Sequence, residues 1–312
     1  MRAVIADPPG PPHYTSFPEP RGGSEAEVVA VLAAALTNLD VATAEGRHYL
    51  APEARPFVVG REAVVRAADG RRLWCNAVSL VAPHGSMAES TLLRAGYGLP
   101  VPEDTPDALA AAIGNAGLAA WLPLSWRARL QPGETVMILG ATGVTGSIAV
   151  TAARRLGAGR VIAAGRRPDA LARALAQGAD AIVRLDRTDL PQAYREVAGA
   201  GVDVVIDYLN GAPAEAALGV MAHSGRMVQV GSGLAPGIHL HAQTARRASL
   251  DVLGFAYYHT PLALQAQAYA ELCRLAIAGE ITLDYEVMPL SNFSEAWMRQ
   301  KASGTTRLVL AN

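Results

Sequence analysis

A glycine-rich turn near the middle of the chain is the strongest chemical signal in the sequence. The apolar run Thr135–Leu139 leads into Gly140-Ala-Thr-Gly-Val-Thr-Gly146, and a helical stretch follows. Gly143 lets the backbone approach a pyrophosphate, and Gly146 lets the helix pack against the strand. Free N–H groups and the helix dipole then favour an anion at the helix start. The pattern predicts a dinucleotide site formed by Gly140, Ala141, Thr142, Gly143, Val144, Thr145 and Gly146.

The end of the next strand indicates which dinucleotide is bound. An NAD site usually has Asp or Glu at this point to hold the ribose hydroxyls. Here Val161–Ala164 ends in Gly165-Arg166-Arg167. Glycine leaves room, and the two guanidinium groups suit a 2′-phosphate, so NADPH is the predicted cofactor. Ala141 replaces the first glycine of the common pattern. The alternatives are a tight turn without a ligand and a solvated pair of arginines.

Regular alternation of strands and helices surrounds the glycine loop. The expected strands are 135–139, 160–164, 181–185, 202–207, 226–230 and 250–255, and the expected helices are 143–156, 168–177, 190–198 and 213–221. Apolar strands that alternate with amphipathic helices predict a parallel sheet covered on both faces, and hence an α/β fold.

The segments on either side of this region show a different sequence pattern. Before Ala112 the sequence favours short strands and turns, with Arg2–Ala6 and Glu27–Leu36 as strands and a hairpin at Asp69-Gly70. A long helix is expected to begin near Thr105-Pro106 and to run to about residue 127. The tail from about residue 259 predicts helices at 262–278 and 292–302 and strands at 285–290 and 306–310.

Composition excludes several classes of protein. The 312 residues carry 27 Lys and Arg against 28 Asp and Glu, a balance that argues against nucleic acid as a partner. Two distant cysteines, Cys75 and Cys273, rule out a disulfide framework and favour a reduced cytoplasmic setting. No apolar run reaches the roughly 18 residues of a membrane helix, and no signal-peptide layout is present, so we expect no membrane association.

Several segments together resemble the zinc-free, quinone-oxidoreductase-like family of medium-chain dehydrogenases and reductases. Beside the glycine loop, the matching segments are Gly46–Tyr49, Gly85–Glu89, Gly117–Trp121, Leu130–Val136, Gly201–Asp207, Gly225–Ser232 and Gly304–Val309. The resemblance spans nearly the whole chain and is strongest from Asn115 onward.

The resemblance implies an architecture and an assembly. A doubly wound Rossmann domain (113–258) would be inserted in a GroES-like, mostly β substrate domain, which both chain ends would build (1–112 and 259–312). It also implies a small-molecule substrate and a homodimer formed by pairing of the last Rossmann strand, near Leu250–Phe255.

The resemblance also assigns roles to individual residues. Gly140 to Gly146 would hold the pyrophosphate, and Gly165, Arg166 and Arg167 would hold the 2′-phosphate. Val230, Gly231 and Ser232 would lie beside the nicotinamide, with Asn115, Leu209, Asn210 and Phe255 near the cofactor and Arg307 reaching its phosphates.

Zinc is not expected. Zinc-dependent relatives carry Gly-His-Glu where this chain has Gly60-Arg61-Glu62, and a protonated arginine offers no lone pair to a metal. The same segment departs from the family, since Ala63 and Val65 replace expected glycines, which predicts a reshaped pocket.

The predicted activity is zinc-independent, NADPH-dependent reduction of an enone, quinone or similar conjugated carbonyl. Tyr49 is the candidate to hydrogen-bond the carbonyl oxygen, with His48 as a lesser one, and the alternative for both is a packing role. Two other functions stay open, namely a non-redox step such as a cyclisation, which the altered Gly60–Val65 segment motivates, and a non-enzymatic NADPH sensor. A short-chain dehydrogenase is excluded because Trp297, not tyrosine, precedes the only lysine, Lys301, by four residues.

Overall fold

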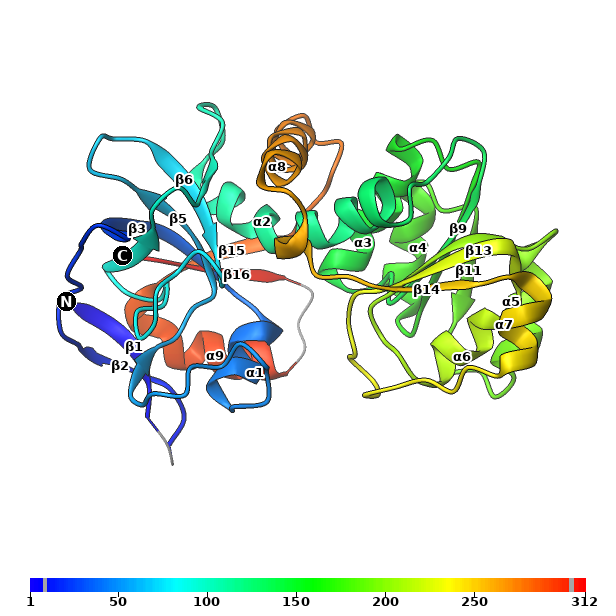
Figure 1. The fold of residues 1–312 in the computed structure, drawn as a ribbon, viewed down its shortest axis with the longest axis horizontal. Coiled ribbons are helices and arrows are strands. Elements are labelled where there is room, and N and C mark those ends of the chain that lie inside the picture. Colours follow the sequence, from blue (N-terminus) through cyan, green and yellow to red (C-terminus); the bar gives the residue numbers. More distant parts are fainter. Residues whose placement is uncertain (8–9, 303–305) are drawn as a thin grey trace. The chain divides into compact units, whose positions relative to one another are not determined.

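The computed structural model describes residues 1–7, 10–302 and 306–312 and divides into two compact units. Unit 1 comprises Met1–Asn115 and Leu262–Asn312, and unit 2 comprises Ala116–Pro261 (Figure 1). The boundaries expected from the family resemblance were after residues 112 and 258. The start of the Gly304–Val309 motif lies outside the described residues.

Unit 2 is built on one six-stranded sheet in which every neighbouring pair is parallel. Its strand order is β11 (Ala181–Arg184), β10 (Arg160–Gly165), β9 (Thr135–Leu139), β12 (Val202–Asp207), β13 (Met221–Gln229) and β14 (Asp251–Gly254). The intervening helices are α3 (Val144–Arg155), α4 (Pro168–Ala176), α5 (Leu190–Ala198), α6 (Ala212–Leu218) and α7 (Ala242–Ala248). This arrangement confirms the predicted α/β fold.

The order of the strands identifies where a ligand site can form in unit 2. From β9 the chain moves outward through β10 and β11 and then returns to the other side of β9 with β12, so the direction of winding reverses there. In open parallel sheets such a reversal opens a crevice at the carboxyl ends of the strands. Leu139 and Asp207, the last residues of β9 and β12, lie side by side in register at this edge.

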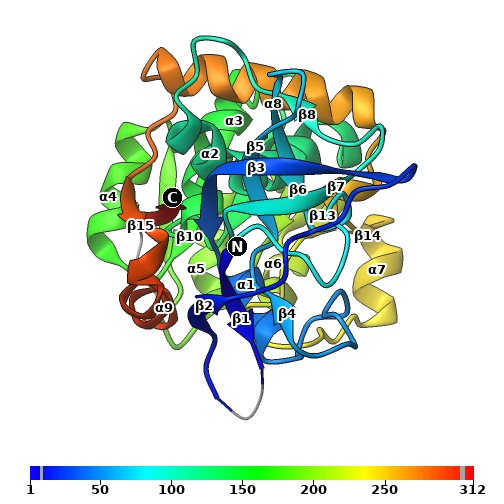
Figure 2. The ribbon, with the colours of Figure 1, turned by 90° about the vertical axis from the view of Figure 1, so that its left-hand side faces the viewer.

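Unit 1 is mostly β and uses both parts of the chain. One sheet has the order β15 (Tyr285–Pro289), β16 (Arg307–Ala311), β3 (Ala26–Leu36), β5 (Glu62–Arg66), β6 (Arg72–Asn76) and β8 (Leu99–Pro100), with β7 (Ser90–Arg94) also paired to β3. A smaller sheet joins β2 (His13–Ser16), β1 (Arg2–Ala6) and β4 (Phe57–Val58). Figure 2 shows β3, β5 and β6 side by side. The tail therefore contributes β15 and β16 to the sheet of unit 1.

The helices of unit 1 and the long helix at the unit boundary follow local signals. The first, α1 (Asn38–Ala44), starts with a capping box between Thr37 and Asp40. The tail contributes α8 (Leu262–Ile277) and α9 (Phe293–Lys301). The long helix α2 (Asp107–Leu122) passes into a π-helical turn, Pro123–Arg127, in which Ala128 N–H donates to the Pro123 carbonyl at 2.8 Å.

Length and composition alone would allow the continuous helix Asp107–Arg127 to cross a membrane, and no other described helix meets that test. However, 67% of its most apolar window is buried within the protein. We therefore interpret it as a core helix.

Several elements were missed or misplaced from the sequence. The helices α1 and α7 and the short strands β2, β4, β7 and β8 were not predicted, and β13 was expected to begin at residue 226 instead of Met221. The segment Met221–Arg226 contains exposed His223 and Ser224 and a positive φ of 59° at Ser224, so its apolar pattern is interrupted although the backbone stays in the sheet.

Candidate functional site

The glycine loop lies at the carboxyl end of β9 and is tied to the neighbouring strand. The N–H groups of Gly140 and Ala141 both donate to the Ala164 carbonyl at 2.9 Å. Gly143 N–H donates back to the Gly140 carbonyl at 3.0 Å, and α3 begins at the next residue. The methyl group of Ala141 is buried, so the turn accommodates the departure from the common glycine pattern.

The spacing of the glycines has a steric reason. A Cβ on Gly146 would lie 2.2 Å from the Gly140 carbonyl oxygen, which no side chain can tolerate. A Cβ on Gly143 would meet only that same oxygen, at 3.5 Å. Gly146, which lies within α3, is thus needed for contact between helix and strand. Open space lies above Gly143, the N-cap residue of the same helix. No side chain caps this helix end, so its first-turn N–H groups are suited to an external anion.

The end of β10 packs against the loop. A Cβ on Gly165 would lie 2.3 Å from Cγ2 of Thr142, so glycine is required for this approach. The Arg167 guanidinium donates to the Thr142 carbonyl, which fixes it beside the loop. Arg166 is exposed. Arg167 is therefore anchored beside the glycine loop, whereas Arg166, its neighbour in the chain, is accessible.

The ends of β12 and β13 contribute the remaining predicted residues of unit 2. The buried Asp207 carboxylate accepts the N–H groups of Leu209 at 2.8 Å and Asn210 at 2.9 Å, and burial raises its pKa. The Asp207 carbonyl accepts the N–H groups of Val230 at 2.8 Å and Gly231 at 3.1 Å. One aspartate thus holds both segments at the carboxyl edge of the sheet.

Three further predicted residues of unit 2 differ in their surroundings. Asn210 is 4% exposed, with a φ of 65°, and its side-chain oxygen has no hydrogen-bond partner within the described residues. Ser232 is exposed. Phe255 follows β14, donates its N–H to Gln229 and packs its ring against Trp126 at 6.2 Å.

Asn115 and Arg307 lie in unit 1, where both contact Glu62. The Glu62 carboxylate accepts the Asn115 N–H at 2.9 Å and forms an ion pair with Arg307. Glu62 is 2% exposed and Arg307 is 8% exposed. The interaction that the structure shows for Arg307 is thus with Glu62, and its contact with a cofactor phosphate stays a prediction.

Glu62 was not recognised as a site residue from the sequence. Burial raises its pKa from 4.5 to about 7, against the opposing effects of the Arg307 charge and the Asn115 hydrogen bond. Asp40 is also fully buried nearby, and burial raises its pKa as well. The sequence did contain an indication: Glu62 follows Arg61 and begins an otherwise apolar run that forms a buried strand. A buried carboxylate needs a partner, so such a position deserved to be considered as a site.

The two catalytic candidates stack on each other in the segment after α1. The rings of His48 and Tyr49 lie 4.2 Å apart, centroid to centroid, and Tyr49 is 75% exposed. His48 Nδ1 accepts the Leu50 N–H at 3.1 Å. Partial burial, assisted by the charge of Arg61, lowers the pKa of His48. Tyr49 is therefore accessible rather than packed in the core.

The altered segment at Gly60 has a structural explanation. Ala63 and Val65 are both fully buried on β5 and belong to the hydrophobic core of unit 1. The two residues that replace family glycines thus fill the core. Within the described residues, no group of three or more His, Cys, Asp or Glu side chains could hold a metal ion.

Comparisons with known proteins agree with this geometry. The profile of the family described as "Zinc-binding dehydrogenase" matches residues 144–276. The crystal structure of the quinone oxidoreductase from Thermus thermophilus, also solved in complex with NADPH, is 30% identical, with all of both chains covered and a TM-score of 0.79. Bovine "Quinone oxidoreductase-like protein 2" is 36% identical over 132 residues, which are 42% of this chain and 38% of that protein.

A third relative is far larger than this chain. A "Mycocerosic acid synthase-like polyketide synthase" of Mycobacterium tuberculosis is 32% identical over 219 residues, which are 68% of this chain but only 10% of the synthase. This chain thus matches about a tenth of the length of that relative.

The fold and the glycine loop define a two-domain dehydrogenase or reductase, with a Rossmann unit and a mostly β unit made from both chain ends. With full-length similarity at 30% identity, the chain belongs to the quinone-oxidoreductase-like family of medium-chain dehydrogenases and reductases. The family predicted from the sequence motifs is confirmed.

Proposed function

We propose that this chain is an NADPH-dependent, zinc-independent reductase of conjugated carbonyl compounds such as enones and quinones. The observation that carries the cofactor assignment is the end of β10, where Gly165, Arg166 and Arg167 stand beside the glycine loop instead of an acidic residue. The NADPH complex of the Thermus thermophilus quinone oxidoreductase supports the same assignment.

The residues of unit 2 fit this cofactor. The open space above Gly143 and the uncapped start of α3 suit a pyrophosphate held by backbone N–H groups. Arg166, which is exposed, is suited to a 2′-phosphate. Asn210, with its buried and unpartnered side-chain oxygen, and the segment Val230–Ser232 would face the nicotinamide end.

When bound, NADPH supplies a hydride to the electrophilic carbon of the substrate. Negative charge then grows on the carbonyl oxygen, and a hydrogen-bond donor placed there stabilises it. We assign this role to the Tyr49 hydroxyl, because Tyr49 is exposed and its ring is oriented by stacking on His48. The lowered pKa of His48 keeps the imidazole neutral at physiological pH, so it adds no positive charge beside the phenol.

The altered Gly60–Val65 segment was the reason to consider a non-redox reaction. The substitutions at Ala63 and Val65 are explained by core packing and require no altered reaction. Reduction is therefore the function that the described residues favour.

The cofactor assignment is tested by titrating NADPH and NADH into the protein by calorimetry. Loss of a charged hydrogen bond to phosphate costs about 1.5–3 kcal/mol, so Arg166→Ala should weaken NADPH by about 10- to 100-fold and leave NADH unchanged. Arg160→Ala is the matched control, because Arg160 is an exposed arginine at the opposite end of β10. Equal affinity of the unaltered protein for the two cofactors would reject the assignment.

The reaction is tested by following NADPH oxidation with a panel of enones and quinones. Turnover of at least one compound is expected. Tight NADPH binding without turnover of any of them would favour a sensor or a non-redox enzyme.

We also propose that two copies of the chain pair through β14. This strand is the last in its sheet, and Val252 on it is 39% exposed. Unpaired edge strands readily join another chain. Light scattering should give the mass of a dimer, and Val252→Lys should shift it toward that of the monomer. A monomeric unaltered protein would end this proposal.

A further inference from the structure

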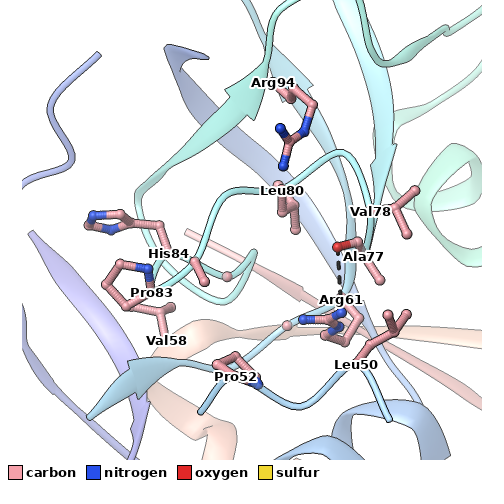
Figure 3. Close-up of a pocket in the computed structure, with 13 residues that line it drawn as sticks. Leu50, Pro52, Val58, Arg61, Ala77, Val78, Leu80, Pro83, His84 and Arg94 are labelled. Carbon is pink, nitrogen blue, oxygen red and sulfur yellow. Dashed lines mark hydrogen bonds between the residues drawn. The ribbon is translucent and has the colours of Figure 1, made fainter. Parts of the chain in front are cut away.

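Unit 1 contains a cavity of about 370 Å³ whose wall comes from five separate segments of the chain (Figure 3). The segment after α1, the end of β4 with the link to β5, the turn after β6, the Pro83–Gly85 loop and the end of β7 all contribute. Such a volume lies at the lower end of the range of small-molecule sites, which is about 300–1,000 Å³. The cavity can therefore hold a compact ligand.

The charges on the cavity wall are all of one sign. Arg61 and Arg94 line it, and no Asp or Glu does. His84 also lines it, but burial lowers the pKa of its imidazole, so the two arginines supply the charge. Figure 3 shows Arg61 and Arg94 reaching the cavity from different elements, and the Arg94 guanidinium points toward Leu80. Within the described part of the chain, Arg94 forms no ion pair, and its guanidinium lies 6.0 Å from the centre of the Tyr97 ring. Arg61 donates to the Ala77 carbonyl at 3.4 Å and lies within electrostatic reach of the buried Asp40. The wall thus has an excess of positive charge that an anion would balance.

Backbone hydrogen bonds fix the loop beside the cavity. His84 N–H donates to Val81, and Ser86 N–H donates to Gly60, each at 3.1 Å. Val58 N–H donates to the Pro83 carbonyl at 2.8 Å, which braces the Pro83–Gly85 loop against β4. Since Arg61 already donates to the Ala77 carbonyl, we assign recognition of an anion to the Arg94 guanidinium, whose planar fork matches a carboxylate.

The rest of the wall is apolar. The aliphatic side chains of Leu50, Val78 and Leu80 line the same cavity as the two arginines (Figure 3). A fully hydrated inorganic ion gains nothing from such surface, whereas a hydrocarbon body does. Charge and wall together favour an anion that carries an apolar body.

We infer that this cavity binds a small organic acid, with the carboxylate at Arg94 and the hydrocarbon part against Leu50, Val78 and Leu80. The site is formed by unit 1 alone, so its occupancy does not depend on hydride transfer. It extends the chemistry of the protein beyond cofactor binding, because it selects acids over neutral molecules of the same shape.

Calorimetric titration with hexanoate, hexanamide and inorganic phosphate tests the inference on the whole chain without NADPH. Hexanoate should bind and hexanamide should not, since the amide has the same shape but lacks the charge. Arg94→Ala should weaken hexanoate by at least about tenfold, the loss expected for one charged hydrogen bond. Arg66→Ala is the matched control, because Arg66 is exposed at the far end of β5 and does not line the cavity.

The location of binding is tested separately with Val78→Trp, which fills the cavity from a partly buried wall position and should abolish binding. Arg94 is exposed, so its replacement leaves the fold intact even if the larger Val78 variant does not fold. Absence of hexanoate binding overturns the inference. It is also overturned by phosphate binding without hexanoate binding, by equal binding of hexanamide, or by equal effects of the Arg94 and Arg66 variants.

Discussion

Replacement of Glu62 by glutamine should make the protein less sensitive to pH, and at neutral pH it should increase rather than decrease stability. Glu62 is 2% exposed, pairs with Arg307 and accepts the Asn115 N–H at 2.9 Å. Glutamine has the same shape and retains an oxygen that can accept this hydrogen bond, but it carries no charge. The substitution therefore isolates the cost of a buried carboxylate.

The size of the effect follows from the pKa of Glu62. Burial raises this pKa from 4.5 to about 7, and the attraction of Arg307 does not cancel the shift. Between these two values the folded protein keeps a proton that the unfolded chain has released, so stability falls as pH rises through that window. A shift of about 2.5 units (7 − 4.5) at about 1.4 kcal/mol per unit corresponds to about 3 kcal/mol. Glu62→Gln has no proton to release and should keep this stability.

The opposite outcome has a definite physical meaning. Removal of one partner of a buried ion pair often costs about 3–5 kcal/mol, because the other charge is left uncompensated. If the pair with Arg307 outweighed burial, Glu62→Gln would be much less stable than the unaltered protein at about pH 8, and the gap would close only as pH falls below about 4.5. That result would refute the reasoning.

Urea unfolding followed by circular dichroism, between about pH 3 and pH 8 at constant ionic strength, measures the difference. Glu134→Gln is the contrasting variant. Burial acts to raise the pKa of Glu134, but hydrogen bonds from Arg226, at 2.8 Å, and from the Gln131 N–H outweigh it and leave the pKa lowered. Ionised Glu134 thus stabilises the fold, and this stability is lost as pH falls below about 4.5. Glu134→Gln should lose stability at neutral pH, with the gap closing in acid, so the two variants should show opposite trends.

Three further outcomes are expected. Gly146→Ala places a methyl group 2.2 Å from the Gly140 carbonyl oxygen, so urea unfolding should show a free energy of unfolding lower by about 1–3 kcal/mol. Gly143→Ala, with 3.5 Å of clearance, should fold normally and lose only NADPH affinity, which calorimetry would measure. Elemental analysis of untagged protein should find no stoichiometric zinc, and one zinc per chain would contradict the assignment. Tyr49→Phe should lower the turnover number for an enone by about tenfold or more with NADPH affinity unchanged, and unchanged turnover would remove Tyr49 from the mechanism.

Local patterns predicted much of unit 2 correctly. The strand, glycine loop and helix at Thr135–Arg155 lie as expected. The steric requirement at Gly146 is set by the Gly140 carbonyl only six residues earlier, so a local pattern records it. The alternation of apolar strands and helices likewise predicted a parallel sheet. These features are recorded within short stretches of sequence, where periodicity and turn residues are informative.

Other features depend on contacts that no local pattern records. Glu62 and Arg307 are 245 residues apart, and only the pairing of β3 with both β5 and β16 brings their strands into one sheet. The α1 helix is different, because its Thr37–Asp40 capping box was visible in the sequence and was overlooked. The cavity lined by Arg61 and Arg94 could not be predicted from the sequence, because only the folded backbone of unit 1 brings the separate segments of its wall together.

The construction of unit 1 from both ends of the chain has a consequence for biosynthesis. The ribosome synthesises the chain from its N-terminus, so β3 emerges long before β16. In the folded protein, however, Leu36 of β3 pairs with Leu308 of β16. Unit 2 is contiguous and can complete its sheet while the tail is still being made. Until β16 emerges, the edge of β3 is open to wrong partners and Glu62 has no guanidinium to balance it. We therefore expect the nascent chain to depend on chaperones most strongly during this interval, and truncations that remove β16 to aggregate rather than to leave a functional fragment.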